Sequence, residues 1–485
     1  MTAARAQTAA AALVPPAGAL LILLCLRLAQ AGHDPFALDP DEGGDICKAL
    51  LVARGHPLYA AVWSDQPPLF THLLRAWCDQ VGWTMPAARL LVSLIAAVLV
   101  FAVADMARLA GGALAAAGAV AALAASATLP RLGVAVMIGL PSVALATLAL
   151  WTLFRWRCRP HPAWLVVSGG LMAASLATKL FTALLLPLFA VWLVLVSSAT
   201  APGTRWRPLA LWLGATAMAT AALIALLVGP HLGALLTPHL AARAAPELAR
   251  FGPGGLVLTA LADWPVTGLG LAACAALAWT RRDATLIFPT WVGVAVLALL
   301  AQRPLWYHHY LLLTVPFAAA IGIALGDGAR RGGWRHGMAV ALLAALAAGG
   351  ASRLAAIDGA ADGTADGARS AMVDAMRRHA GAQHVALATD PMFAFRAGAT
   401  MPPTLAILST KRVATDPELT GAIAAVFATA PPEQVVLHDG AAPRLRAAIT
   451  RGMGGNYREV FAGGGARLWV RRDLLADGLH GAASR

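Results

Sequence analysis

Long apolar segments separated by short polar breaks run along the first three quarters of the chain. A helix that spans a membrane needs about 20 mostly apolar residues, and windows of this kind recur from Ala11 onward. The fifth and sixth of them form one apolar run that is broken only near Lys179. The pattern predicts about eleven spanning helices, at residues 12–31, 86–107, 112–129, 133–154, 163–179, 180–197, 208–229, 255–279, 284–301, 310–326 and 337–355.

Two stretches are too polar to span a membrane: the loop 32–85 and the segment after residue 357. The second opens with a Gly-, Ala- and Asp-rich stretch, Asp358–Gly367, whose composition predicts a linker. Apolar runs of helical and strand type then alternate, as in a small α/β domain. We expect a helix near Met372–His379 and strands near His384–Thr389, Gln434–His438, Tyr457–Phe461 and Ala466–Val470.

The fold class that follows is an all-α polytopic membrane domain with a small C-terminal α/β domain. The membrane domain covers residues 1–357 and includes the outer loop 32–85, and the α/β domain covers residues 358–485. Composition agrees, because 59% of the 485 residues are hydrophobic, 13% are charged and the mean hydropathy is +0.69. A soluble globular protein is less apolar than this.

The formal charge of +13 comes mostly from arginines in short loops, where they orient a membrane protein and meet anionic lipid head groups. No nucleic-acid-binding module is visible, so nucleic acid is not an expected partner. One set of alternate loops holds eleven of these residues: Arg108, Arg155, Arg157, Arg159, Arg205, Arg207, Arg281, Arg282, Arg330, Arg331 and Arg335. The opposite short loops hold five basic residues: Arg131, Lys179, Arg243, Arg250 and Arg303.

Cytoplasmic loops of membrane proteins carry the excess of Lys and Arg. We therefore expect a multi-pass protein of the bacterial inner (plasma) membrane, with its N-terminus in the cytoplasm and its C-terminal domain in the periplasm. No small-residue cleavage site follows the first apolar segment, which predicts an uncleaved helix. The five cysteines show no C-x-x-C spacing. Cys47 and Cys78 share the outer side and could pair or stay as thiols.

Acidic residues gather in the loop 32–85, in the run Asp39-Pro40-Asp41-Glu42-Gly43-Gly44-Asp45. If a helix begins near Asp41, then Asp41 and Asp45 share one face. Two explanations stay open. Asp39 or Asp41 could cap an interfacial helix with the other acids solvated, or the acids could carry chemistry. A Gly-x-Pro-x-Tyr turn at 55–59 and a Pro-Pro pair at 67–68 in the same loop favour the second.

These motifs resemble those of the GT-C glycosyltransferases, in particular the protein O-mannosyltransferase and aminoarabinose-transferase-like group. The resemblance covers nearly the whole chain. It rests on Asp41-Glu42, Arg54-Gly55-x-Pro57-x-Tyr59, Asp65-x-Pro67-Pro68-Leu69, Ala177-Thr178-Lys179 and Tyr307-His308-His309-Tyr310, and on Thr389-Asp390-Pro391 and Met401-Pro402-Pro403 in the outer domain.

The resemblance implies that Asp41 is the catalytic base, with Glu42 beside it, and that Asp45, Asp65 and Gln66 meet substrate. Many relatives carry Asp-Lys-Pro-Pro or Glu-Lys-Pro-Pro where this chain reads Asp65-Gln66-Pro67-Pro68. Because the lysine is missing, either other cations compensate or the donor differs.

Outer-face cations and aromatic residues are the candidates for meeting a donor phosphate: Lys179, Arg303, Tyr307, His308, His309 and Tyr310. The alternatives are that Lys179 only snorkels and that the Tyr and His residues are interfacial anchors. Adjacent histidines point to different faces of a helix, which disfavours a two-histidine metal site. A divalent metal is compatible with the chemistry, but the sequence requires none.

The implied function is inverting glycosyl transfer, of a hexose or a pentose, at the outer face of the membrane. The donor would be a polyprenyl-phosphate sugar, the acceptor a lipid, glycan or protein, and membrane lipid the surrounding partner. A membrane transporter or lipid flippase with an outer accessory domain is the alternative, for which Asp263, inside an apolar segment, is the candidate residue. A relative without activity that only binds carrier lipid or a partner is a third possibility.

Overall fold

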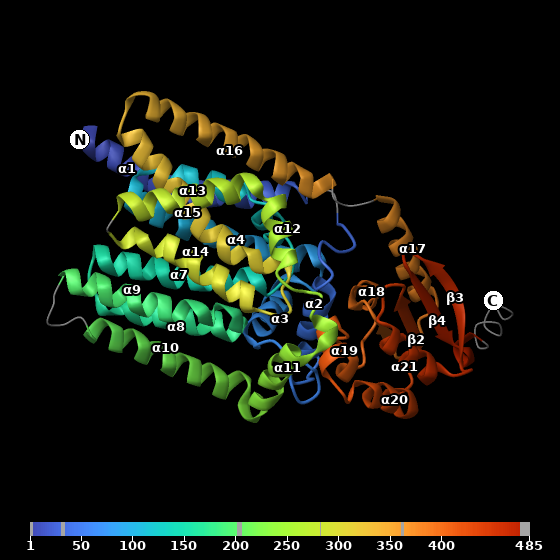
Figure 1. Ribbon diagram of the computed structural model, residues 1–485. Helices are drawn as coiled ribbons and strands as arrows, with labels where there is room; N and C mark the ends of the chain where they lie inside the picture. The colour runs from blue at the N-terminus through green and yellow to red at the C-terminus, as the bar shows by residue number, and fades with distance from the viewer. Residues whose placement is uncertain (1–2, 31–33, 201–205, 282, 360–362, 476–485) are drawn as a thin grey trace. The chain divides into compact units, whose positions relative to one another are not determined.

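The computed structural model describes residues 3–30, 34–200, 206–281, 283–359 and 363–475 (Figure 1). The chain divides into two compact units. The helical unit consists of residues 1–33, 89–229 and 250–359, and the mixed unit of residues 34–88, 230–249 and 360–485. The loop that the sequence placed with the membrane domain therefore packs with the C-terminal segment in the mixed unit. Arg205, Arg282 and residues 31–33, where that loop begins, lie outside the described residues.

Each of the eleven apolar segments coincides with a helix or a pair of consecutive helices. They are α1 (Ala3–Leu28), α4 (Met85–Gly111), α5 (Ala113–Ala125), α7 (Gly139–Cys158), α8 (Pro162–Thr178), α9 (Leu185–Thr200), α10 (Trp206–Leu227), α12 with α13 (Gly254–Ala262, Trp264–Thr280), α14 (Ile287–Ala301), α15 (Leu311–Arg330) and α16 (Gly333–Gly359). In the described part of the chain, seven helices are long and apolar enough to span a membrane, or eight if one bent pair counts as a span. The apolar helices α5 and α8 are shorter, at 13 and 17 residues. The chain is a multi-pass membrane protein.

Two polar residues interrupt the apolar helices. At Lys179, α8 ends, the backbone is extended, and a 3-10 turn (η1, Leu180–Leu184) precedes α9. At Asp263 the pair α12 and α13 bends by 96°, and Pro265 lies in the first turn of α13. Asp263 is fully buried, and its Oδ1 accepts a hydrogen bond from the Ala127 N–H at 2.9 Å. This bond ties the bend between α12 and α13 to Ala127.

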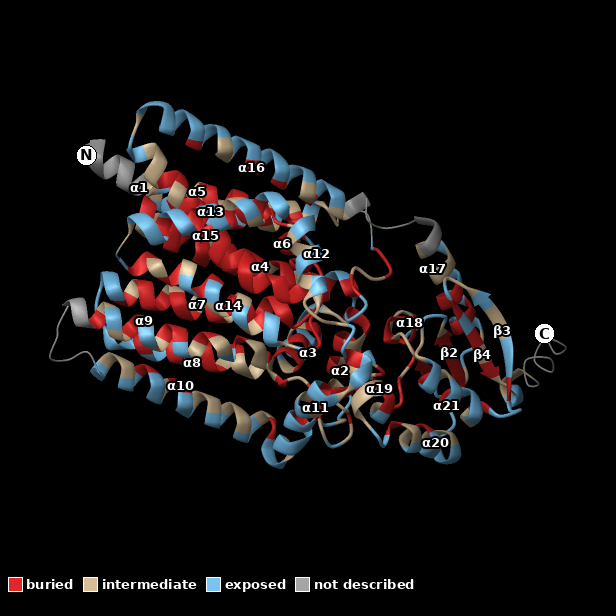
Figure 2. Ribbon diagram, in the orientation of Figure 1, coloured by how far each residue is buried: buried red, intermediate tan, exposed pale blue. Residues whose placement is uncertain are grey.

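Small residues let the central helices approach closely. Gly322 and Gly326, four residues apart on α15, lie against the backbone of Ala115 and Gly111, so that a Cβ at either glycine would overlap a carbonyl oxygen. Such spacing of small residues is typical of helix packing in membranes. Figure 2 shows the consequence, with α15 and α4 buried while α10 and α16 present exposed faces. Those faces are apolar: Leu226 and Trp334 are 80% and 71% exposed, as lipid-facing residues are.

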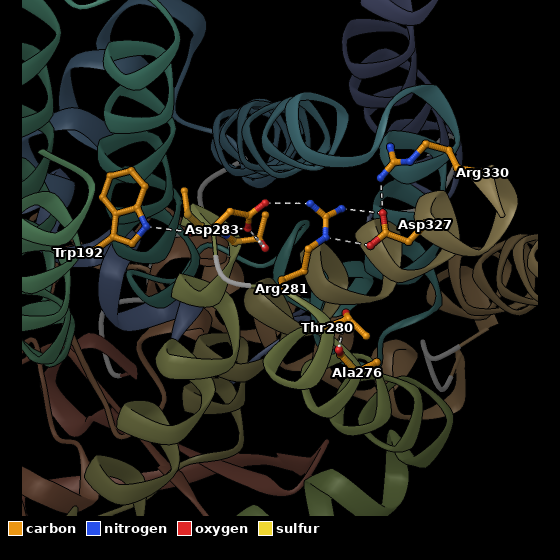
Figure 3. Close-up of polar contacts among 9 residues, drawn as sticks. Trp192, Ala276, Thr280, Arg281, Asp283, Asp327 and Arg330 are labelled. Carbon is orange, nitrogen blue, oxygen red and sulfur yellow. Dashed lines mark hydrogen bonds and ion pairs between the residues drawn. The ribbon is translucent and has the colours of Figure 1, made fainter. Parts of the chain in front are cut away.

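An ion-pair cluster joins the ends of α13 and α15 (Figure 3). Arg281 donates to both carboxylate oxygens of Asp327, at 3.0 and 2.6 Å, and to Asp283 at 2.9 Å. Arg330 also pairs with Asp327. Asp283 in turn accepts from the N–H of Thr285 at the start of the next helical turn. Bidentate pairs of this kind fix geometry as well as charge, so part of the basic set predicted to be cytoplasmic stabilises the bundle.

The mixed unit combines α2 (Glu42–Ala53), α3 (Leu69–Val81) and α11 (Leu232–Ala244) with a described four-stranded sheet of order β1-β2-β4-β3. The strands are β1 (Ala386–Ala388), β2 (Gln434–His438), β3 (Tyr457–Gly463) and β4 (Ala466–Arg471), all at their predicted places. β1 pairs with β2 in parallel, and the other pairs are antiparallel. Helices α17 (Gly363–Arg378), α18 (Pro391–Ala397), α19 (Thr410–Thr415), α20 (Leu419–Thr429) and α21 (Pro443–Met453) complete it.

The predicted linker Asp358–Gly367 is in part helical. Residues 360–362 lie outside the described residues, but α17 begins already at Gly363. Alanines and ion pairs one turn apart, such as Asp366 with Arg369 at 3.2 Å, favour the helix. Cys47 and Cys78 are both buried and free, and burial raises their thiol pKa values to about 12 and about 11.

Candidate active site

The acids at the start of α2 differ in exposure and in contacts. Asp41 occupies the N-cap position and is exposed, but its side chain makes no capping hydrogen bond. Glu42 is fully buried and accepts from the Leu38 N–H at 2.7 Å, which ties the preceding turn to the helix. Asp45, one turn later, is buried and pairs with Lys48 at 2.7 Å. Of the two predicted catalytic carboxylates, Asp41 is exposed and Glu42 is buried.

The glycines of this segment allow close packing. Gly43 lies against the Met392 N–H of α18, where a Cβ would overlap backbone atoms. The Cys47 thiol lies 3.5 Å from the Pro391 carbonyl. Gly55, with φ +87°, follows the end of α2 in a conformation that favours glycine. Close packing at Gly43 and backbone conformation at Gly55 therefore account for these two glycines.

The second acidic element, Asp65-Gln66, is held by two segments from elsewhere in the chain. Lys411 on α19 donates to Asp65 Oδ2 at 2.7 Å, and Gln66 Nε2 donates to the same oxygen at 2.9 Å. His239 on α11 lies 2.6 Å from the Asp65 carbonyl oxygen and 3.1 Å from Lys411 Nζ. Tyr59 closes the turn by donating to the Gln66 carbonyl at 2.8 Å.

Charges alternate through this network and keep its members ionised. Burial acts to raise the pKa of Asp65, but Lys411, with Lys48 nearby, holds that pKa below its ordinary value. Burial acts to lower the pKa of Lys48, but Asp45, with Asp65 and Asp41 nearby, raises it above its ordinary value. Paired opposite charges have this effect on each other. The network thus places ionised groups of both signs, Asp65 and Lys48, in the loop that carries Asp41.

The helical unit holds a separate cluster that contains most of the predicted phosphate-binding residues. Lys179 Nζ lies 3.1 Å from His308 Nε2 and 5.0 Å from the centre of the Phe181 ring. His309 packs on the same ring, with centroids 5.5 Å apart. Lys179, His308 and His309 are buried. Segments that are far apart in the sequence therefore meet at these residues.

The other three predicted phosphate-binding residues, Tyr307, Tyr310 and Arg303, have different surroundings. Tyr307 carries the guanidinium of Arg131 over its ring, 4.1 Å from the centroid. The Tyr310 hydroxyl is hydrogen-bonded to Thr267 on α13 and the residue is buried. Arg303 is exposed and makes no hydrogen bond or ion pair with the described residues. Tyr310 thus holds two helices together, and Arg131 is the second cation of the cluster where we expected Arg303.

Four polar residues of these clusters had no assigned role in the sequence prediction: Lys48, Arg131, His239 and Lys411. The sequence does carry a signal for two of them. The chain has 37 Lys and Arg residues, of which only Lys48, Lys179 and Lys411 are lysines, and all three lie in these clusters. Among the described residues, no group of three His, Cys, Asp or Glu residues is arranged to hold a metal ion.

Comparison with known proteins gives a fold match and no sequence match: no protein-family model and no curated protein matches the chain. The chain is similar to ArnT, the aminoarabinose transferase, from Cupriavidus metallidurans bound to undecaprenyl phosphate. The TM-score is 0.67 at 15% identity, covering 93% of this chain and 97% of that one. The apo ArnT structure gives a TM-score of 0.65 at 14% identity, covering 93% and 96%.

A second type of structure matches as well. It is the archaeal oligosaccharyltransferase AglB from Archaeoglobus fulgidus, in complex with an inhibitory peptide and a dolichol-phosphate, with a TM-score of 0.57 at 13% identity. The match covers 92% of this chain and 72% of that one. Both neighbours are GT-C membrane glycosyltransferases, and this chain has the GT-C fold that its motifs predict.

Proposed function

We propose that this protein is a membrane glycosyltransferase that moves a sugar from a polyprenyl-phosphate donor to an acceptor. One observation carries the proposal. In a chain whose fold is similar to ArnT bound to undecaprenyl phosphate, Asp41 is exposed at the head of a helix in which the neighbouring acids Glu42 and Asp45 are buried. An exposed base supported by a rigid, charge-balanced network is what proton abstraction from an acceptor requires.

The reaction is an inverting displacement of a hexosyl or pentosyl group. An acceptor hydroxyl attacks the anomeric carbon, its proton passes to Asp41, and the bond between that carbon and the phosphate oxygen breaks. The leaving group is the polyprenyl phosphate, which keeps the bonding electrons and gains negative charge. Lys179 and Arg131, with His308, meet that charge, since such preorganised donors are typically worth about 3–4 kcal/mol each.

Asp45, Asp65 and Gln66 support the base in this proposal. Asp45 pairs with Lys48, and Asp65 pairs with Lys411 and acts on Lys48 through its charge. Glu42 shapes the turn before α2 through its bond to Leu38. The acceptor is a lipid, a glycan or a protein.

The proposed orientation places the mixed unit on the periplasmic side of a bacterial inner membrane, because the larger set of basic loops is then cytoplasmic. A fusion of alkaline phosphatase after Arg485 should be active. An inactive phosphatase together with a fluorescent cytoplasmic reporter at the same point would reverse the orientation.

The test of the function is an assay of the purified full-length protein with undecaprenyl-phosphate sugars and with nucleotide sugars. Asp41→Asn should lower transfer at least about 100-fold, the usual contribution of a general base. Asp79→Asn is the control, because Asp79 is an exposed acid of the same loop that pairs, among the described residues, with its neighbours Arg75 and Trp83. Near-normal transfer by a folded Asp41→Asn protein would contradict the assignment of Asp41 as the base. Turnover of a nucleotide sugar alone would contradict the assignment of a polyprenyl-phosphate sugar as the donor.

A further inference from the structure

The three lysines of the chain are placed with unusual selectivity. Arginine supplies every other basic side chain apart from histidine. Lys48 and Lys179 are 5% and 9% exposed, and the Lys411 side chain is 12% exposed. A compact ammonium with three donors fits a tight polar site that a planar guanidinium cannot occupy. Lys48 pairs with Asp45, and Lys179 belongs to the cluster proposed to meet the donor phosphate. Lys411 is the lysine of the C-terminal segment.

Lys411 connects three segments of the chain at one point. Its ammonium can only donate, so the His239 Nδ1 at 3.1 Å must accept. The His239 proton is therefore on Nε2, which donates to the Asp65 carbonyl oxygen at 2.6 Å. Lys411 also donates to the Asp65 carboxylate at 2.7 Å. The three groups form a closed ring that fixes both the main chain and the side chain of Asp65.

The helix that carries Lys411 is also held by contacts that do not involve Lys411. Ser409 caps α19 by accepting from the Arg412 N–H at 3.2 Å. Arg412 is buried, donates to the carbonyls of Thr404 and Ile407 at 2.7 and 2.9 Å, and lies 4.9 Å from the centre of the Trp63 ring. A neutral residue at position 411 should therefore leave α19 docked on the loop that carries Asp65.

A second set of contacts joins the C-terminal segment to the loop 34–88. Arg396 on α18 forms a bidentate pair with Asp34, at 2.7 and 3.0 Å, and donates to the Phe36 carbonyl at 3.0 Å. The Phe36 and Phe393 rings lie 4.7 Å apart. The anchoring of the loop 34–88 thus has several components, of which Lys411 is the one directed at an acid of the candidate site.

We propose that Lys411 is a positioning residue for the transfer reaction, supplying to the Asp65-Gln66-Pro67-Pro68 turn the positive charge that this turn lacks at position 66. The expected effect of Lys411 on the rate of transfer rests on the proposed function. Gln66 Nε2 already lies 2.9 Å from Asp65 Oδ2, so a lysine at position 66 would reach the same carboxylate. The C-terminal segment therefore contributes a charge to the acidic network of the first loop.

The experiment compares Lys411→Met, the double variant Lys411→Met/Gln66→Lys, and Arg444→Met as a control. Arg444 is an exposed basic residue on α21 of the same unit. We expect Lys411→Met to lower kcat about 10- to 100-fold, the cost of misplacing a supporting group, with donor KM little changed. Gln66→Lys should restore most of the lost kcat, and Arg444→Met should behave as the unmodified protein does.

Amide hydrogen exchange supplies a readout that does not need activity. Exchange over residues 57–66 should rise in Lys411→Met, while exchange over α17 stays the same. Unchanged exchange and unchanged kcat would overturn the inference. A loss of kcat that Gln66→Lys does not restore would also overturn it, because Lys411 would then only join segments. If the unmodified protein transfers no polyprenyl-phosphate sugar, the proposed function fails and the exchange result alone decides the inference.

Discussion

The two polar clusters use similar cations in different surroundings. In the mixed unit, Lys48 and Lys411 each lie 2.7 Å from an aspartate, which offsets their charge. In the helical unit, Lys179 lies against an imidazole nitrogen and a phenylalanine face, and Arg131 lies over a tyrosine ring. Aromatic faces attract a cation without neutralising it. The first arrangement suits the support of a base, and the second suits the binding of an anion.

The largest effect should come from breaking a buried pair of the mixed unit. Lys48→Met leaves Asp45 buried without its partner, and removing one member of a buried ion pair typically costs about 3–5 kcal/mol of folding free energy. The double variant Asp45→Asn/Lys48→Met should recover much of that loss, because no charge is then left alone. Thermal unfolding of the purified protein measures both.

A matched control exists on the next helix. Arg75 and Asp79 form an exposed pair at 3.4 Å, with side chains 42% and 38% exposed. Pairs of this kind contribute about 0–1 kcal/mol, so Arg75→Gln should change the unfolding temperature little. Equal destabilisation by Lys48→Met and Arg75→Gln would contradict the description of the Lys48 network as a buried, charge-balanced support.

The next effect concerns the helical unit and its anion. Lys179→Met should weaken the binding of undecaprenyl phosphate about 10- to 100-fold, because a hydrogen bond to a charged group contributes about 1.5–3 kcal/mol. Arg157→Gln is the control, an exposed arginine of the set predicted to be cytoplasmic. Titration with the lipid in detergent micelles gives the affinities. An unchanged affinity in Lys179→Met would remove Lys179 from phosphate binding and leave its role structural.

A smaller effect should appear in the pH dependence of stability. Because the folded-state pKa of Asp65 is held below its ordinary value, its ionised form stabilises the protein. That contribution is complete above the unfolded value of about pH 4 and is lost as the pH falls through the folded value. The stability difference between the unmodified protein and Asp65→Asn should therefore be constant near neutral pH and shrink below about pH 4. A difference that grows with acidification would have the wrong sign.

Most of the fold could be predicted from local patterns. All eleven apolar segments are helical, the strand Gln434–His438 has its predicted bounds, and the helix break at Lys179 lies where one charge interrupts an apolar run. These features depend on hydropathy and propensity within about 20 residues. The start of α17 at Gly363 was missed because composition alone does not show ion pairs one turn apart.

The candidate site was predictable only in part. Asp41 and Asp45 follow from a short motif, and Lys179 and His308 from charges at apolar boundaries. The pair of Lys411 with Asp65, however, joins residues 346 positions apart in the chain, and no local pattern specifies which loops meet. Gln66 stands where the resemblance implies a lysine, and the scarcity of lysine in the chain was the one signal that pointed to Lys411.

The smallest effect should come from a variant in the ion-pair cluster of Figure 3. This variant tests whether lipid binding is independent of the stability of the helical unit. Asp283 precedes α14 and Tyr307 follows it, so the length of this 15-residue helix, about 22 Å, lies between that cluster and the Lys179 cluster. Arg281→Gln removes the bidentate bond to Asp327 at the partly exposed end of α13, where such pairs contribute about 1 kcal/mol or less. We expect a slightly lower unfolding temperature and unchanged affinity for undecaprenyl phosphate. Arg157→Gln, which breaks no ion pair among the described residues, should change neither. Weaker lipid binding in Arg281→Gln would mean that the two ends of the helical unit are coupled, and the phosphate site could then no longer be ascribed to Lys179 and its neighbours alone.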